Sequence, residues 1–162
     1  MENLNRYAPP KSEVVDVQAL DEAPPLWNPN AAANWSLLFS PIFGAIVQMK
    51  NWQALGETKR AANSKMWAIG TAIAIVVVTI LSAAAAVSTN TPDVGRSFGF
   101  VILIVWYFAS GRAQTKFIKD RFGKDYPRRG WGKPLLIAIG IIFGVVAVAM
   151  IIGAIIGIAS QM

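Results

Sequence analysis

The chain has 162 residues, of which 54% are hydrophobic and 15% charged, and its net charge is +6. A soluble domain usually carries about 25% charged residues, so the composition points away from an ordinary soluble protein. Cysteine and histidine are both absent, which excludes disulfides, thiolate metal sites, cysteine nucleophiles and lipid-modified cysteine, and removes the commonest general base and metal ligand.

Residues 1–33 form a polar segment that holds five prolines, a residue that discourages helix. Five acidic residues outnumber two basic ones, and no apolar run of the kind found in a secretory signal occurs. Because so polar a segment buries little surface, we expect a tail that is disordered or loosely docked. A short docking motif at residues 5–10 is the alternative.

Residues 34–48 are apolar, but fifteen residues of helix reach only about 22 Å, less than the hydrocarbon core of about 30 Å. Pro41 and Gly44 lie near the middle and are expected to interrupt a helix. We expect a re-entrant or interfacial segment, with a short fourth span as the alternative. Residues 49–65 are basic, with a net charge of +3. Within them, residues 52–62 have the pattern of an amphipathic surface helix, with Trp52 at the membrane–water boundary.

Two transmembrane helices are predicted next. Residues 66–88 contain 23 residues without a charge, which is long enough to cross a bilayer with some tilt. Residues 89–96 form a short link that contains Pro92 and Gly95 and has no net charge, so the flanking spans should pair as an antiparallel hairpin. The second span covers residues 97–112, and its helix can continue through Arg112, whose side chain can reach the interface.

Residues 112–134 carry the main charge of the chain, with eight basic and two acidic side chains, a net of +6 that equals the charge of the whole protein. Aromatic residues are interspersed among them. We expect a basic loop on the membrane surface, because basic side chains are attracted to anionic lipid and aromatic ones settle at headgroup level. The residues expected to contact lipid or a partner are Arg112, Lys116, Lys119, Arg121, Lys124, Arg128, Arg129, Trp131 and Lys133.

Residues 135–160 form the last predicted span, again without a charge. It contains two small-xxx-small pairs, Gly140 with Gly144 and Gly153 with Gly157, which allow close helix packing. On a helical projection, Gly140 and Gly144 share one face with Ala147 and Ala154. A second small face, roughly opposite, holds Ala138, Ala149, Gly153 and Ser160. We therefore expect a helix neighbour on both sides.

These elements predict an all-α, multi-pass membrane protein with three firm transmembrane helices and one re-entrant or interfacial segment, all within a membrane domain of residues 34–162. The two basic segments and the link without net charge indicate the same topology, because lysine and arginine in short loops stay in the cytoplasm. Residues 112–134 are then cytoplasmic, and so is the amino terminus if residues 34–48 are re-entrant.

For function, the basic loop favours topology determination and lipid anchoring, with docking of an acidic partner or a specific lipid headgroup as the sharper hypothesis. The expected role is an accessory, scaffold or partner-binding component, one form of which is a membrane-resident immunity protein. A small oligomeric channel or transporter is the alternative. Expected partners are anionic lipid headgroups and another membrane protein or a second copy, but not nucleic acid. No catalytic motif, metal-ligand cluster or cofactor motif occurs, so neither an enzyme nor a cofactor is expected.

Two short stretches resemble known sequence patterns. Residues 5–11, Asn-Arg-Tyr-Ala-Pro-Pro-Lys, resemble the N-P-Y-x-P-P leader of small uncharacterised proteobacterial inner-membrane proteins, with Arg6 in place of the proline. Residues 34–41, Asn-Trp-Ser-Leu-Leu-Phe-Ser-Pro, are similar to the N-W-x-x-x-F-x-P segment that precedes a hydrophobic hairpin in such families. The resemblance implies a multi-pass location in a bacterial inner membrane and transfers no activity.

Overall fold

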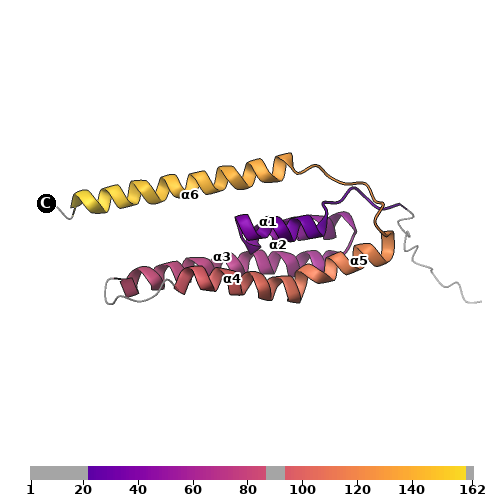
Figure 1. Ribbon diagram of the computed structural model, residues 1–162, viewed down its shortest axis with the longest axis horizontal. Helices are drawn as coiled ribbons and strands as arrows, with labels where there is room; N and C mark the ends of the chain where they lie inside the picture. The colour runs from indigo at the N-terminus through magenta and orange to yellow at the C-terminus, as the bar shows by residue number, and fades with distance from the viewer. Residues whose placement is uncertain (1–21, 87–93, 160–162) are drawn as a thin grey trace, which may run out of the picture.

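A computed structural model describes residues 22–86 and 94–159, and within them the chain is helical without strands. The elements are α1 (Pro29–Phe39), α2 (Pro41–Ala54), α3 (Thr58–Ala86), α4 (Val94–Trp106), a π-helical turn η1 (Tyr107–Gly111), α5 (Arg112–Phe122) and α6 (Gly132–Ala159). Figure 1 shows them running along the long axis of the molecule. The predicted all-helical class is confirmed for these residues. Two helices, α3 and α6, are long and apolar enough to cross a membrane.

The helices α1 and α2 form a hairpin that breaks at Ser40, where φ is +123°. Pro41 then begins α2, a position where the missing N–H costs nothing. The break was expected near Pro41 and Gly44, but Gly44 lies inside α2 and is buried. The hairpin also begins earlier than residue 34. The Asn28 side chain accepts a hydrogen bond from the Asn30 backbone N–H at 3.0 Å, which caps α1 at its start.

Of the predicted tail, residues 1–33, which was expected to be disordered or loosely docked, the structure describes residues 22–33. Leu26 is fully buried against Trp52 and Ile118, so this part of the tail is docked. Its backbone pairs with the segment before α6, because the Leu26 N–H donates to the Pro127 carbonyl and the Arg129 N–H donates to the Leu26 carbonyl, both at 2.9 Å. The possible docking motif at residues 5–10 lies outside the described residues.

The expected surface helix over residues 52–62 is wrong, because α2 ends at Ala54 and α3 begins at Thr58. Gly56 turns the chain between them with φ of +74°, a conformation that glycine adopts without steric cost. Trp52 was expected at the membrane–water boundary, but its side chain is only 2% exposed. It packs edge-on against Phe117 of α5, with ring centroids 5.1 Å apart. The indole therefore belongs to the core.

Beyond the α2–α3 turn, α3 and α4 lie side by side (Figure 1). The helix expected over 66–88 begins earlier, at Thr58. The span expected over 97–112 is divided among α4, η1 and the start of α5, which follow one another without a break in the helix. At the level of η1, Trp106 is 2% exposed and packs with Ala45 of α2 and Ala68 of α3. This second cluster joins three helices.

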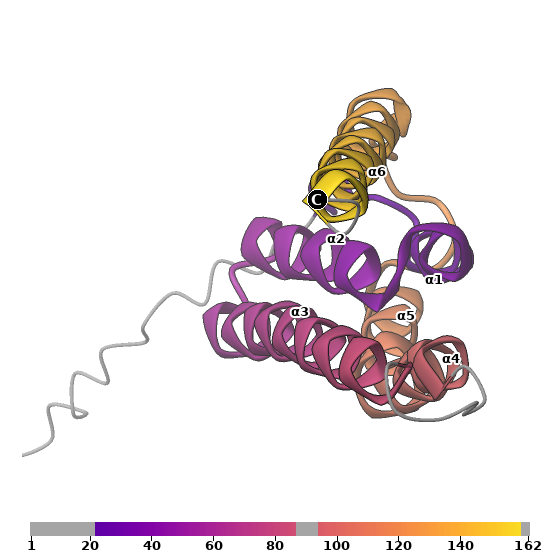
Figure 2. The ribbon, with the colours of Figure 1, turned by 90° about the vertical axis from the view of Figure 1, so that its left-hand side faces the viewer.

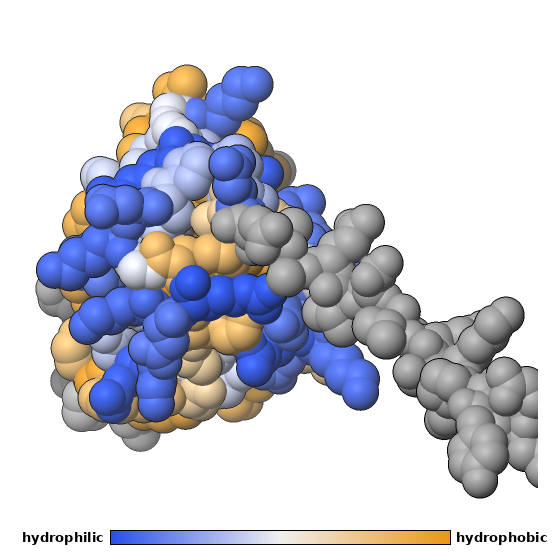
Figure 3. Space-filling view, turned by 90° about the vertical axis from the view of Figure 1, so that its right-hand side faces the viewer, coloured by the Kyte–Doolittle hydropathy of each residue, from blue (hydrophilic) through white to orange (hydrophobic). Residues whose placement is uncertain are grey.

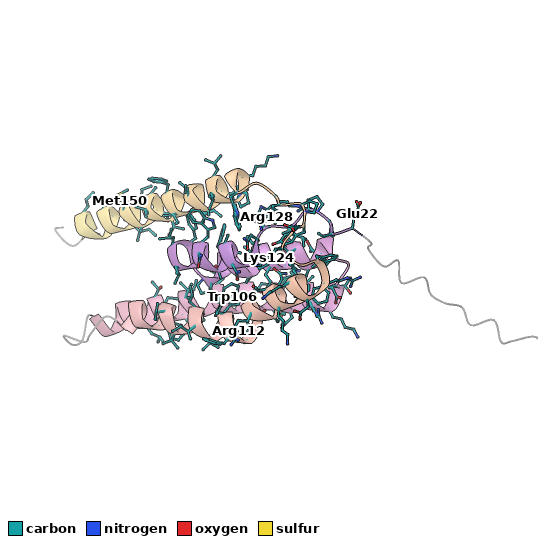
Figure 4. The ribbon with its side chains drawn as sticks, turned by 45° about the vertical axis from the view of Figure 1, so that its right-hand side comes forward. Glu22, Trp106, Arg112, Lys124, Arg128 and Met150 are labelled. Carbon is teal, nitrogen blue, oxygen red and sulfur yellow. The ribbon has the colours of Figure 1, made fainter. Side chains whose placement is uncertain are left out.

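The last helix, α6, lies beside the α1–α2 hairpin and apart from α3 and α4, as the end-on view in Figure 2 shows. Its carboxyl end lies at the same end of the molecule as the carboxyl end of α3 and the amino end of α4 (Figure 1). The labelled side chains of Glu22, Lys124 and Arg128 lie toward the opposite end in Figure 4. The molecule therefore has one apolar half and one polar half.

Candidate functional site

The polar end of the molecule carries the predicted basic residues, but half of the expected loop is a helix. Arg112, Lys116, Lys119 and Arg121 belong to α5, and only residues 123–131 form a loop. All of the eight basic side chains predicted as contact residues are exposed. Figure 3 shows hydrophilic side chains surrounding a hydrophobic strip at this end. We call this surface, formed by α5, residues 123–131 and the start of α6, the basic end.

Contacts with the docked segment before α1 hold the loop of the basic end in place. The Trp27 indole Nε1 donates to the Gly130 carbonyl at 3.0 Å, in addition to the Leu26 backbone pairing. The Arg129 guanidinium lies 4.8 Å from the centroid of the Trp27 ring, a favourable cation–π distance. Residues 128–130 are therefore held in place by the segment before α1.

Arginines at the basic end, and Arg60 of α3 beside it, lie over aromatic rings. Arg60 lies 4.6 Å from the centroid of the Phe117 ring and 5.0 Å from that of Trp52. Arg128 lies 5.6 Å from the centroid of the Tyr126 ring. Burial raises the pKa of the Tyr126 phenol above its usual value, and the opposing effect of the Arg128 charge is smaller. Within the described ranges, the ion pair found is Arg60 with Glu57 at 3.8 Å. Most of the positive charge is thus not neutralised by carboxylates.

Trp131 was expected to contact lipid or a partner, and the structure places it half-buried against the α1–α2 hairpin. Its ring centroid lies 6.5 Å from that of Trp35 on α1 and 6.3 Å from that of Phe43 on α2. These distances suit tilted aromatic pairs. Trp131 immediately precedes α6, so the aromatic cluster fixes where the last helix departs from the rest of the molecule.

A buried polar network connects α2 with η1 and α5. The Gln48 side chain donates from Nε2 to the Ser110 carbonyl at 2.7 Å and accepts from the Ser110 hydroxyl at 3.1 Å. Gln114 donates to the Gln48 carbonyl at 2.9 Å. Asn51 donates to the Gln114 Oε1 at 3.1 Å and to the Trp27 carbonyl at 2.8 Å. The four side chains satisfy one another, as buried polar groups must.

Sequence analysis missed this network, although a spacing signal was present. Gln48 and Asn51 are three residues apart, and Ser110 and Gln114 are four apart, so each pair shares a helix face. The network meets the helix at η1, because the Gln48 amide donates to the carbonyl of Ser110 inside this π-turn.

The glycines predicted to pack against neighbouring helices lie on an exposed helix. A Cβ built at Gly140, Gly144 or Gly153 would meet no atom within 4 Å in this chain, and Gly157 is exposed on the same helix. Among the described residues, no helix of this chain packs against these glycines, so close helix packing at α6 stays a prediction. One member of the second small face, Ala138, is buried and lines a groove beside α1 and α2.

This groove, which we call the α6 groove, has a volume of about 420 Å³ and an almost entirely apolar lining. Its walls come from α6 and from the α1–α2 hairpin. Two lysines, Lys50 of α2 and Lys133 of α6, are its charged lining residues. The remaining lining residues are Trp27, Phe39, Ser40, Ile42, Phe43, Ile46, Val47, Pro134, Ile137, Ala138, Ile141 and Ile142.

Two further cavities are less distinctive. One of about 510 Å³ lies between α3 and α4 and includes Trp67, Gly70 and Ile102 in its lining. The other, of about 300 Å³, lies at the basic end beside Lys119, Lys124 and Arg128. Over residues 22–86 and 94–159, no three acidic side chains come together as a possible metal site.

No protein family model, curated protein or solved structure matches the chain.

Proposed function

We propose that the chain is an integral inner-membrane protein that crosses the bilayer three times and acts as an accessory or scaffold component for another membrane protein. The spans are α3, α6 and the continuous helix formed by α4 and η1. The 13 residues of α4 and 5 of η1 reach about 27 Å, close to a hydrocarbon thickness of about 30 Å. The α1–α2 hairpin is re-entrant, because 14 residues of α2 reach only about 21 Å.

The charge distribution supports a cytoplasmic basic end. Twelve lysine and arginine side chains are described, against four carboxylates. They lie in or next to the α2–α3 turn, on α5, in the loop after it and at the start of α6. This concentration beside the ends of the spans is the pattern that retains a segment in the cytoplasm. The same charges attract anionic headgroups, each contributing about 1 kcal/mol near the surface.

The observation that carries the proposed role is the exposure of α6. Its large apolar side chains project outward, with Ile141 61% and Phe143 70% exposed. Lipid can cover such residues, but glycines in membrane helices give no lipid contact and instead permit close approach of another helix. Gly140 and Gly144 form that kind of exposed small patch. We therefore assign α6 as the docking helix, for another membrane protein or for a second copy of the chain.

The topology is tested by single-cysteine labelling, which needs no background removal because the chain contains no cysteine. In sealed bacterial cells, a membrane-impermeant maleimide should label Thr91→Cys and Ala159→Cys but not Lys124→Cys, which should react only after the membrane is permeabilised. Equal labelling of all three positions from outside would contradict the three-span arrangement. Protection of Ala159→Cys alone would remove α6 as a span.

The docking role is tested by adding bulk to the small face of α6. Gly144→Phe should abolish co-purification of the partner, or dimerisation if the partner is a second copy, because a ring prevents close helix approach. Met150→Phe is the matched control, since Met150 is already large and 64% exposed on the same helix. If both variants assemble like the parent chain, α6 is not the docking helix. Ion flux through vesicles that contain the purified chain alone would favour the channel alternative.

A further inference from the structure

The α6 groove combines two features that a phospholipid also combines. Its walls are apolar, and two ammonium groups, those of Lys50 and Lys133, belong to the same cavity. None of the four carboxylates in the described part of the chain lines this groove. Both lysines are exposed, so a bound anion could reach them from the aqueous side. The groove therefore presents positive charge next to apolar surface.

The dimensions of the groove match one leaflet. Along α6, the lining extends from Lys133 to Ile142, nine residue steps with a rise of about 13.5 Å. Half of a hydrocarbon core is about 15 Å thick. Lys133 is at the amino end of this stretch, and Lys50 lies near the carboxyl end of α2, beyond Ile42 and Ile46 of the same wall. An acyl chain that follows the isoleucines would thus bring its headgroup to the lysines.

The groove is also not closed by the chain itself. Ile137 is 63% exposed and Ile46, on the facing helix, is 44% exposed. The opening is held apart at its base by the packing of Trp131 on Trp35 and Phe43. Apolar cavities far smaller than this one, about 150 Å³, bind apolar ligands rather than water. Within a membrane, the available apolar ligand is a lipid chain.

We propose that the α6 groove binds one acyl chain of an anionic phospholipid, whose phosphate is held by Lys50 and Lys133. This inference rests on the proposed passage of α6 through the bilayer. The lipid would act as a wedge between α6 and the α1–α2 hairpin, and would fix the angle at which the docking helix is presented. Lipids with net-neutral headgroups would compete only through their chains.

The test is native mass spectrometry of the intact chain, purified in detergent and titrated with dioleoyl phosphatidylglycerol or dioleoyl phosphatidylcholine. The parent chain should retain one phosphatidylglycerol in preference to phosphatidylcholine. Lys50→Gln with Lys133→Gln should weaken phosphatidylglycerol retention about 25-fold, at about fivefold for each lysine. Lys65→Gln, an exposed lysine of α3 that lies outside the groove and outside the basic end, should leave this preference unchanged.

A second pair of variants tests the groove itself. Ala138→Phe fills it and should abolish retention of either lipid, whereas Ala149→Phe adds the same ring to an exposed site on α6 outside the groove and should not. Retention by Ala138→Phe at the parent level would overturn the proposal, even if the lysine variant loses lipid. Unchanged binding by the lysine variant would overturn it equally. Cysteine labelling of the same variants separates these results from a failure of α6 to cross the membrane.

Discussion

Replacing Gly44 by alanine is expected to lower the free energy of unfolding by about 3 kcal/mol, the upper part of the range for overpacked cores. A Cβ at this position would overlap the Ser36 hydroxyl oxygen and the Trp106 ring. Neither neighbour can readily move away. Ser36 is buried and donates to the Ala32 carbonyl at 2.7 Å, and Trp106 is enclosed by α2 and α3. The gain in helix propensity, about 1 kcal/mol, is too small to compensate.

Titration of the detergent-solubilised chain with sodium dodecyl sulfate, followed by circular dichroism, measures this effect. Gly70→Ala is the matched control, because Gly70 is exposed on α3 and a Cβ there would meet no atom within 4 Å. That variant should be unchanged or slightly stabilised, by up to about 1 kcal/mol. If Gly44→Ala behaves like Gly70→Ala, the close packing of α2 against Trp106 is refuted.

Replacing Gln48 by methionine is expected to cost about 3 kcal/mol of unfolding free energy. Methionine has a similar volume but leaves both the hydroxyl and the carbonyl of Ser110 without the bonds that Gln48 provides. Each buried polar group left unpaired costs about 1–3 kcal/mol. Interhelical hydrogen bonds between membrane helices average only about 0.6 kcal/mol. The expected effect is larger because the hydroxyl and the carbonyl of Ser110 lose their bonds to Gln48 at once.

A double-mutant cycle identifies the origin of the loss. Ser110→Ala removes the stranded hydroxyl, so Gln48→Met with Ser110→Ala should be less destabilised than the sum of the single variants. Gln53→Met, at an exposed site on the same helix, should leave stability within about 0.5 kcal/mol. Strict additivity of the two buried substitutions in the same detergent titration would show that Gln48 and Ser110 do not act as a pair.

The helical class and the two long apolar helices follow from the sequence because the signal is physical and local. Peptide groups cannot remain unpaired in hydrocarbon, so runs without charge, such as residues 66–88 and 135–160, predict helices before any tertiary contact is known. Hydropathy predicts the ends of these helices less accurately. Thr58 begins α3 inside a charged stretch, where hydropathy gives no boundary and the turn at Gly56 decides.

Composition does not predict three other features of the fold, because each depends on the contacts of particular residues. Asn28 followed by Pro29 is a helix-start signature, yet the proline content around it favoured a disordered tail. Gly44 was interpreted as a helix breaker, whereas the structure uses its lack of a side chain to admit Trp106. The charges of residues 112–122 suggested a loop and obscured the helix that buries Ile118. For Gly44 and Ile118, the deciding contact comes from a distant part of the chain.

One part of the candidate site could likewise be predicted from the sequence, and another part could not. The basic residues could be predicted because charge is visible in the sequence, and the structure gathers them at one end. The α6 groove could not, because Lys50 and Lys133 come from different helices, and the contacts that join these helices, such as the Trp131 aromatic cluster, come from distant parts of the chain. The polar network of Gln48, Asn51 and Gln114 was equally hidden, since polar residues within apolar helices reveal a partner only when the facing helix is known.

The attachment of Trp27 to Gly130 has a consequence for how the protein is made. This hydrogen bond joins residues 103 positions apart, and synthesis at about 5–20 residues per second separates their emergence from the ribosome by about 5–20 s. During that interval the apolar side chain of Leu26 has no Ile118 to cover it, although Trp52 is already present. The docked segment before α1 is thus translated early but is among the last segments to reach its native position, which it does when the loop before α6 has been made.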